Sequence, residues 1–226
     1  MENKNFNWDS FLVPYELAIE GFIVKFESIK KQYILNNLYN PIEIVTGRVK
    51  TVNSILEKAE RLKVDFGDIP DKIFDIAGIR VTCKYIPDVY KVMELINSRK
   101  DVNIISIKDY VKKPKPSGYR SLHIIAKYNV ETLGGQSPIY LEFQIRTHAM
   151  HLWASIEHEL KYKYQRNIPS TVQDRLFKAG IAAKKVDVEM SKIKETMDKL
   201  EAKNGITIAP QMLEEKEITI HSLRKW

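Results

Sequence analysis

A group of basic residues in the first third of the chain has the composition and spacing of a phosphate-binding surface. Its members are Arg48, Lys50, Ser54, Lys58 and Arg61. The last three recur at i, i+4 and i+7, so in a helix they lie within about 60° of one another. Phosphate binding needs several converging donors, with Arg supplying paired donors and Lys a point charge. A solvated helix face, with Arg61 paired to Glu57, is the alternative interpretation.

Two carboxylates stand where they could hold a magnesium ion. Asp75 lies just before one predicted strand, and Glu142 lies inside another, on the same side as Gln144 and Arg146. Mg²⁺ commonly takes one or two protein carboxylates and completes its shell with water and substrate phosphate oxygens. The polar sides of the other strands add Arg80, Thr82, Lys84, Ser121 and His123. An ordinary exposed sheet face would explain the same pattern.

The segment from residue 108 to 123, KDYVKKPKPSGYRSLH, is a basic loop with an aromatic residue in it. Its cations are Lys108, Lys112, Lys113, Lys115 and Arg120, and they surround two prolines and a Ser-Gly-Tyr turn. Such a loop suits a nucleotide, because the cations can take phosphate while the ring of Tyr119 takes a base. The alternative is a basic surface loop without a ligand.

Three histidines follow the last predicted strand. His148, His151 and His158 fall on one side of a helix, but their spacing is not the His-Glu-x-x-His pattern of a zinc site. We therefore expect packing or supporting roles for them. Cys83 falls on the apolar side of its strand, which indicates a core position.

Alternating residues predict the sheet that must position these groups. Strands are expected at residues 79–85, 121–130 and 139–146, and a further apolar run lies at residues 104–107. Gly134-Gly135 signals a hairpin between the last two strands. The sheet should therefore be mixed or partly antiparallel.

Three- and four-residue spacing of apolar residues predicts helices around the sheet. They are expected at residues 8–35, 52–62, 88–99, 147–164 and 170–203, with a short segment at 42–50 leading into the second. The last helix carries a 4-3-4-3 apolar seam typical of a coiled coil: Val172, Leu176, Ala179, Ala183, Val186, Met190, Ile193, Met197 and Leu200. Such a seam needs a partner, which is either the chain's own first helix or another subunit.

Composition limits the class of protein. The chain has 226 residues and a formal net charge of +7, with 44% hydrophobic and 29% charged residues. That composition excludes a disordered or low-complexity chain, and the positive charge favours polyanionic partners. A single cysteine cannot form an internal disulfide, and the opening MENKNFNWDS lacks the apolar core of a signal peptide. No apolar run approaches the ~20 residues that cross a bilayer. We expect a cytoplasmic protein that is not bound to a membrane.

Four segments in order resemble the RelA/SpoT-type alarmone synthetase domain. They are VTGRVKTVNSILEKAERL at 45–62, FDIAGIRV at 74–81, DYVKKPKPSGYRSLH at 109–123 and LEFQIRTHAMHLWASIEHELKYKY at 141–164. Together with the opening FLVPYELA and the long terminal helices, they are similar to the small, single-domain members over residues 8 to 200. Four ordered motifs are far more specific than any one of them.

The resemblance implies a fold and a division of the chain. The fold would be α/β (α+β), with a mixed, partly antiparallel sheet flanked by helices, nucleotidyltransferase-like, with long N- and C-terminal helices. Residues 1–40 would form an N-terminal helix and 41–165 the synthetase domain. Residues 166–204 would form an oligomerising helix and 205–226 a flexible tail.

The resemblance also implies an activity. The chain would transfer the β,γ-pyrophosphoryl group of ATP to the ribose 3′-hydroxyl of GTP or GDP, making pppGpp or ppGpp and AMP in the stringent response. By the family pattern ATP would be held by Arg48, Lys50, Ser54, Lys58, Arg61 and Arg80, with the two guanidinium groups Arg48 and Arg80 stacked on adenine. Asp75 and Glu142 would hold Mg²⁺, and Glu142 would receive the 3′-hydroxyl proton. The guanosine nucleotide would meet Lys108, Lys115, Tyr119, His123 and Gln144, with the Tyr119 ring on the base.

Departures from the family set the remaining expectations. The chain matches no hydrolase half, so we expect synthesis only. A homotetramer is expected from the seam. The lysines and the aromatic that bind a regulatory alarmone in some members are replaced by Ile23, Glu27 and Ile44, which argues against activation by product. The alternative function is a regulatory module of the same fold that binds a nucleotide or single-stranded RNA without turnover.

Overall fold

A five-stranded mixed sheet forms the centre of the computed structural model, which describes residues 6–164 and 168–204. The strands are β1 (Ile44–Val49), β2 (Ala77–Cys83), β3 (Val102–Asp109), β4 (Leu122–Thr132) and β5 (Gly135–Thr147), in the spatial order β1-β2-β5-β4-β3. Only the β2–β5 pair is parallel, and β4 and β5 form the hairpin expected at Gly134-Gly135. The predicted mixed α/β fold is confirmed.

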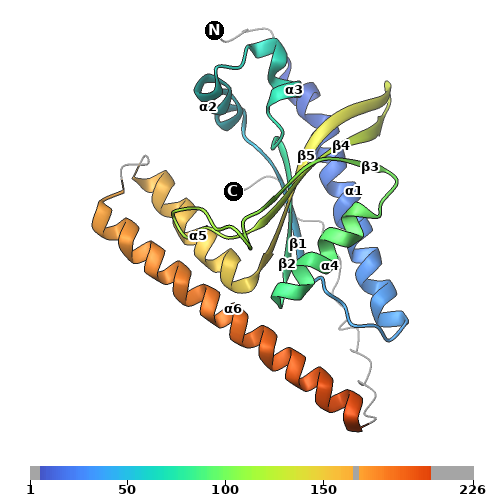
Figure 1. Ribbon diagram of the computed structural model, residues 1–226. Coiled ribbons are helices and arrows are strands. Elements are labelled where there is room, and N and C mark those ends of the chain that lie inside the picture. Colours follow the sequence, from blue (N-terminus) through green and yellow to red (C-terminus); the bar gives the residue numbers. More distant parts are fainter. Residues whose placement is uncertain (1–5, 165–167, 205–226) are drawn as a thin grey trace.

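Helices cover both faces of this sheet (Figure 1). They are α1 (Trp8–Leu35), α2 (Val52–Leu62), α3 (Ile69–Lys72), α4 (Ile86–Asn97), α5 (His148–Lys163) and α6 (Ser170–Asn204), with a 3-10 turn η1 (Phe66–Asp68) before α3. α1 and α4 lie against one face, whereas α5 lies against the other with α6 alongside it. None of these helices has the length and apolarity to span a membrane.

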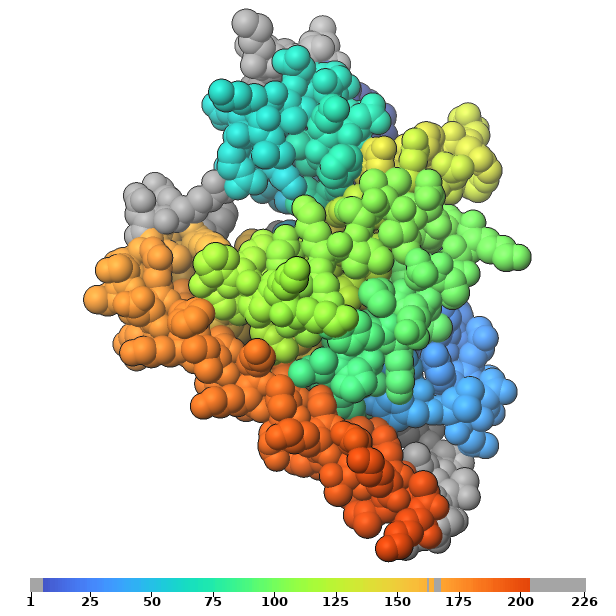
Figure 2. All heavy atoms as spheres, in the orientation of Figure 1, coloured from blue at the N-terminus to red at the C-terminus, as the bar shows by residue number. Residues whose placement is uncertain are grey.

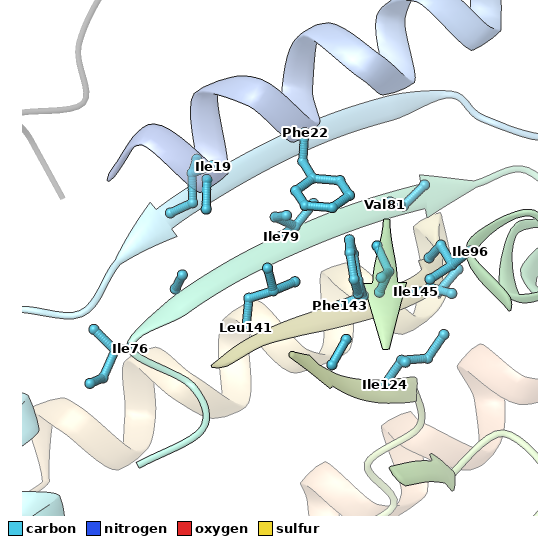
Figure 3. Close-up of a cluster of buried hydrophobic side chains, with 14 of the residues drawn as sticks. Ile19, Phe22, Ile76, Ile79, Val81, Ile96, Ile124, Leu141, Phe143 and Ile145 are labelled. Atoms are coloured by element: carbon cyan, nitrogen blue, oxygen red, sulfur yellow. The ribbon is translucent and has the colours of Figure 1, made fainter. Parts of the chain in front are cut away.

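The apolar core fills the space between the sheet and α1 and α4. Every second side chain of the three central strands is fully buried there, including Ile79, Phe143 and Ile124. The ring of Phe22 on α1 meets that of Phe143 edge to face at 5.1 Å, and Ile96 on α4 closes the same cluster (Figure 3). The alternating pattern therefore leaves the opposite side of β2, β4 and β5 free for polar groups.

Two strand predictions need correction. The strand expected at residues 79–85 is β2 and ends at Cys83, because Tyr85 becomes the N-cap of α4 and Pro87 stands in its first turn. The segment at 42–50, expected only as a lead-in to α2, contains the edge strand β1, which pairs antiparallel with β2.

The seam of α6 is split between two environments. Leu176 and Ala183 are partly covered by the chain's own α5 side, whereas Met190, Ile193 and Leu200 are 48%, 51% and 48% exposed. A strict heptad row drifts by about 20° per heptad around a straight helix, so the row leaves the packed side within a few turns. Its packed part meets α5 rather than the first helix. The predicted tail at 205–226 and the boundary at 165–166 lie outside the described residues.

Candidate active site

The polar face of the sheet brings most of the expected site residues into two adjacent rows. In one row Arg80, Gln144, His123 and Lys108 stand on β2, β5, β4 and β3 in register. In the next row Glu142 lies opposite Gly78, which lies opposite Arg48 of β1. Gly78 has no side chain, so nothing stands on the sheet between the carboxylate of Glu142 and the guanidinium of Arg48.

A closed ring of hydrogen bonds surrounds Glu142. Its Oε1 lies 2.7 Å from Nδ1 of His123, and its Oε2 accepts a 2.6 Å bond from Nε2 of Gln144. Nε2 of His123 lies 2.6 Å from the hydroxyl of Tyr119. Arg146 Nη2 donates both to that hydroxyl at 2.6 Å and to Oε1 of Gln144 at 2.8 Å, which completes the ring.

The direction of these hydrogen bonds is defined at Glu142. Burial would raise the pKa of Glu142, but the hydrogen bond and charge of His123 and the bond from Gln144 hold its pKa below the ordinary 4.5. The ionised carboxylate therefore accepts, from Nδ1 of His123 and from Nε2 of Gln144. Two hydrogen-bonded chains thus connect Arg146 to Glu142, one through Tyr119 and His123 and one through Gln144. Both fix the carboxylate and leave its other lone pairs available.

A second charged cluster lies where β2 begins. The carboxylate of Asp75 meets Nζ of Lys58 at 2.7 Å and Nζ of Lys50 at 3.3 Å. Burial raises the pKa of Asp75, but the two ammonium groups outweigh it and the pKa is lowered. Burial also lowers the pKa of Lys50, as do the charges of Arg48 and Lys58. The single carboxylate of Asp75 does not balance the three cations Lys50, Lys58 and Arg48. The cluster therefore has an excess of positive charge, which a polyanion would neutralise.

Arg80 lies between these two clusters. Burial, with the charges of Arg146 and Arg48, lowers its pKa to about 10, so the guanidinium stays charged at neutral pH. Its Nε is buried without a hydrogen-bond partner within the described part of the chain. A buried unpaired donor is unfavourable, and a ligand that accepted from it would remove the penalty.

The remaining expected residues occupy the rims of the site. Ser54 belongs to the first turn of α2, where its hydroxyl accepts a 3.0 Å bond from Thr51. Arg61 is exposed in the last turn of the same helix. Lys115 places its Nζ over the ring of Tyr119, 4.8 Å from the centroid, and Tyr119 is only 9% exposed. A base that stacks on Tyr119 would therefore take the place of Lys115.

A large cleft of about 1270 Å³ opens between α2 and the α5–α6 pair. Its walls come from α2, the loop at residues 116–117, α5 and the beginning of α6, and Figure 2 shows the hollow between α2 and that loop. Of the expected residues only Arg61 lines it, whereas His158 and Lys161 of α5 do so unexpectedly. The cleft has room for a nucleotide, and the residues of the two charged clusters are not part of its lining.

The donor set fits magnesium bound together with substrate. No group of three or more histidine, cysteine or acidic side chains within residues 6–164 and 168–204 could hold a metal ion alone. Asp75 and Glu142 are close enough for the charge of one to affect the pKa of the other. Oδ1 of Asp75 is buried and lacks a hydrogen bond of good geometry. Among the described residues, its polar contact is the ion pair with Nζ of Lys58. Two carboxylates leave most of an octahedral shell for water and phosphate oxygens.

Comparison with known proteins identifies the family. Residues 47–167 match the model described as "Region found in RelA / SpoT proteins". The chain belongs to the RelA/SpoT family. All the expected site residues lie inside the matched segment. The GTP pyrophosphokinase YjbM of Bacillus subtilis is 44% identical over 202 residues, which cover 89% of this chain and 94% of YjbM.

Solved structures agree with this RelA/SpoT assignment. The small alarmone synthetase 1 of B. subtilis bound to its product pppGpp matches with a TM-score of 0.81 and 44% identity, over 84% of this chain and 97% of that one. A GTP pyrophosphokinase family protein from Streptococcus pneumoniae matches with a TM-score of 0.82 and 40% identity, over 89% and 98%. The chain is thus similar over most of its length to small, single-domain synthetases of the family.

Sequence reasoning left Arg146 and Asp187 without an assigned role, and it counted Arg120 among the loop cations that could take phosphate, whereas Arg120 is buried in an ion pair. Arg146 was placed on the polar face but given no function, although its position two residues after Gln144 was the available signal. Arg120 and Asp187 form a buried ion pair across 67 residues of sequence, which no local pattern indicates. Of the expected set, the structure groups Lys50, Lys58 and Asp75, and separately groups Tyr119, His123, Glu142 and Gln144.

Proposed function

We propose that this chain is a GTP pyrophosphokinase that transfers the β,γ-pyrophosphoryl group of ATP to the 3′-hydroxyl of GTP or GDP. The products are AMP and pppGpp or ppGpp. The observation that carries the proposal is the pair of clusters within one family segment: an ionised Glu142 fixed by two hydrogen-bonded chains, beside a basic group with excess positive charge around Asp75. No covalent intermediate is needed, so positioning and charge neutralisation supply the catalysis.

ATP binds on the side of β1, β2 and α2. Lys50, Lys58 and Arg61 hold the triphosphate, with Ser54 donating at the start of α2. Arg48 and Arg80 stack on adenine, as planar guanidinium groups can. The buried, unpaired Nε of Arg80 supports this assignment, because a bound nucleotide supplies acceptors that the protein does not.

The guanosine nucleotide binds on the side of β3, β4 and the loop before β4. Tyr119 stacks on the base once Lys115 moves toward phosphate, and Lys108 stands beside His123 in the register of the strands. Gln144 and His123 orient Glu142 toward the ribose. The 3′-hydroxyl is then presented to the ATP phosphates across the space above Gly78.

The bond changes follow from this placement. The 3′-oxygen attacks the β-phosphorus of ATP, and the bond from that phosphorus to the oxygen bridging to the α-phosphate breaks, so AMP leaves. Glu142 accepts the proton of the 3′-hydroxyl, a step typically worth about 10² to 10⁴ in rate. Mg²⁺ held by Asp75, Glu142 and the phosphates would neutralise the charge that develops on the transferred group.

Acceptor comparison tests the proposal. Purified protein with ATP and Mg²⁺ is supplied with GMP, GDP or GTP in turn, and nucleotides are separated by anion exchange. AMP and a guanosine 3′-pyrophosphate should form with GDP, GTP or both, and form slowly or not at all when Mg²⁺ is chelated. Well-folded protein that binds these nucleotides without turnover would support the alternative of a regulatory module. Salt-sensitive binding of single-stranded RNA would support its RNA-binding version.

Assembly and location complete the proposed role. The exposed apolar part of the α6 seam suits contact with other copies, and we assign a homotetramer to it. The protein works in the cytoplasm, which supplies ATP and GTP. It synthesises alarmone without hydrolysing it, so ppGpp incubated with the protein and Mn²⁺ should persist.

A further inference from the structure

α6 meets the loop that carries Tyr119 directly at two places and through Trp153 of α5 at a third. Gly180 approaches Gly118 so closely that a Cβ at Gly180 would lie 3.2 Å from the Gly118 carbonyl oxygen. Trp153 of α5 donates from Nε1 to the carbonyl of Leu176 on α6 at 2.7 Å, and its ring packs against that of Tyr119. Arg120 Nη1 lies 2.8 Å from Oδ2 of Asp187.

The Arg120–Asp187 pair is almost completely buried. Its side chains are only 5% and 4% exposed. Removing two charges from water costs several kcal/mol per ion, so a buried pair is weak evidence for stability. Burial raises the pKa of Asp187, although Thr147 and Arg120 act in the opposite direction. Since the pair by itself is weak evidence for stability, its position against the loop is the more informative observation.

The neighbours of Arg120 indicate what the pair does. The backbone amide of Lys115 donates to the carbonyl of Tyr119 at 3.1 Å, and that of Gly118 donates to Lys115 at 2.9 Å, so residues 115–119 form one closed turn. Gly118 has φ +92°, which a residue with a side chain rarely adopts. Arg120 directly follows this turn, so fixing Arg120 restrains the backbone of the turn and with it the position of Tyr119.

We propose that the Arg120–Asp187 ion pair is a positioning pair for the guanosine nucleotide, through which α6 holds the 115–121 loop in its binding geometry. The inference rests on the proposed function, because it takes the guanosine side of the site to be this loop. α6 then belongs to the substrate site as well as to assembly. The ATP side, built on β1, β2 and α2, has no part in the contact.

A buried charge pair can be tested without leaving a charge unpaired. Asp187→Asn breaks the pair but leaves the Arg120 guanidinium buried and unpaired, which destabilises the fold. The double variant Arg120→Met with Asp187→Leu removes both charges at similar volume and should keep its melting temperature. Glu189→Gln is the matched control, since Glu189 lies on the same helix with its side chain 66% exposed.

For each full-length variant, kcat and the KM values for GTP and ATP are measured by steady-state kinetics. GDP affinity is measured by calorimetry, and the melting temperature reports on the stability of the fold. We expect the double variant to raise KM for GTP and Kd for GDP about tenfold, because small misplacements of a binding group are costly. KM for ATP should stay within about twofold of wild type, and Glu189→Gln should match wild type.

Two outcomes overturn the inference. A stable double variant with wild-type KM for GTP and Kd for GDP shows that the pair does not position the loop. Equal increases in both KM values, or loss of kcat alone, show a general structural effect. A wild-type chain that forms no product contradicts the proposed function instead, and the GDP affinities then decide the inference by themselves.

Discussion

Nδ1 of His123 lies 2.7 Å from Oε1 of Glu142, and the two residues stand on adjacent strands that share a polar face. His123 pairs with Gln144 in the register of the sheet, one step along from the pair that contains Glu142. The contact therefore follows from strand pairing, and it holds the carboxylate ionised in a buried position. This geometry makes Glu142 the group best placed to accept a proton.

Glu142→Gln should remove activity and leave the fold intact. The amide cannot accept the 3′-hydroxyl proton, so kcat should fall by about 10² or more. It keeps an oxygen acceptor, and the imidazole of His123 can change tautomer to accept from its NH₂ group. The melting temperature should stay close to wild type. Glu94→Gln, exposed on α4, is the control and should retain full activity. A large fall in melting temperature for Glu142→Gln would mark Glu142 as structural.

Asp75 should contribute to stability in a defined pH window. The unfolded carboxyl titrates near its ordinary pKa of 3.8, whereas Lys50 and Lys58 hold the folded-state pKa lower. Its stabilisation is therefore fully present above about pH 4 and is lost as pH falls through the folded pKa. Denaturant unfolding of wild type and Asp75→Asn at several pH values checks this. The difference in the free energy of unfolding should shrink in acid. If the difference in the free energy of unfolding between wild type and Asp75→Asn grows in acid, the pKa of Asp75 is not lowered in the folded state.

Arg80→Ala should weaken ATP binding selectively. Loss of the guanidinium removes a surface on which adenine stacks, so KM for ATP should rise about tenfold, equivalent to about 1.4 kcal/mol. KM for GTP should change much less. The control is Lys84→Ala. Lys84 directly follows β2, and its side chain is 40% exposed and forms an ion pair with Glu43. An equal effect of Arg80→Ala on both substrates would place this residue outside the ATP side.

Substitution in the exposed seam of α6 should dissociate the assembly. Met190→Glu with Ile193→Glu puts charge on side chains that are 48% and 51% exposed in the single chain, so the isolated fold should tolerate it. Sedimentation velocity should show a smaller species than wild type. Lys192→Glu, on another side of the helix and 65% exposed, should leave the assembly unchanged. A wild-type protein that sediments as a monomer would reject the seam as an interface.

Local patterns predicted the helices and strands well where the two-residue or helical spacing of apolar residues continues over a long segment. The β4–β5 hairpin and α1 are examples, because alternation and apolar spacing persist there for many residues. β1 was missed as a strand because it has only six residues, and it lies at the sheet edge where exposed and partly exposed positions alternate without a buried side. Short edge strands carry little apolar signal.

Contacts between distant segments could not be predicted from the residues alone. Nothing local indicates that β2 pairs with β5, so the placement of Arg80 beside Gln144 required the structure. The family resemblance supplied those residues and their roles, whereas the closed hydrogen-bond ring through Arg146 came from the geometry. The split of the α6 seam likewise depends on where α5 lies, which helical periodicity does not specify.

The ratio of leaving group to product tests the central claim most directly. Wild-type protein is incubated with ATP, GTP and Mg²⁺, the nucleotides are quantified by anion exchange, and the attachment of phosphorus to the 3′-oxygen is read by ³¹P NMR. Transfer of pyrophosphate predicts AMP and pppGpp in equal amounts, with both lost in Glu142→Gln. ADP as the leaving product, or unchanged ATP and GTP with correctly folded protein, would contradict the account.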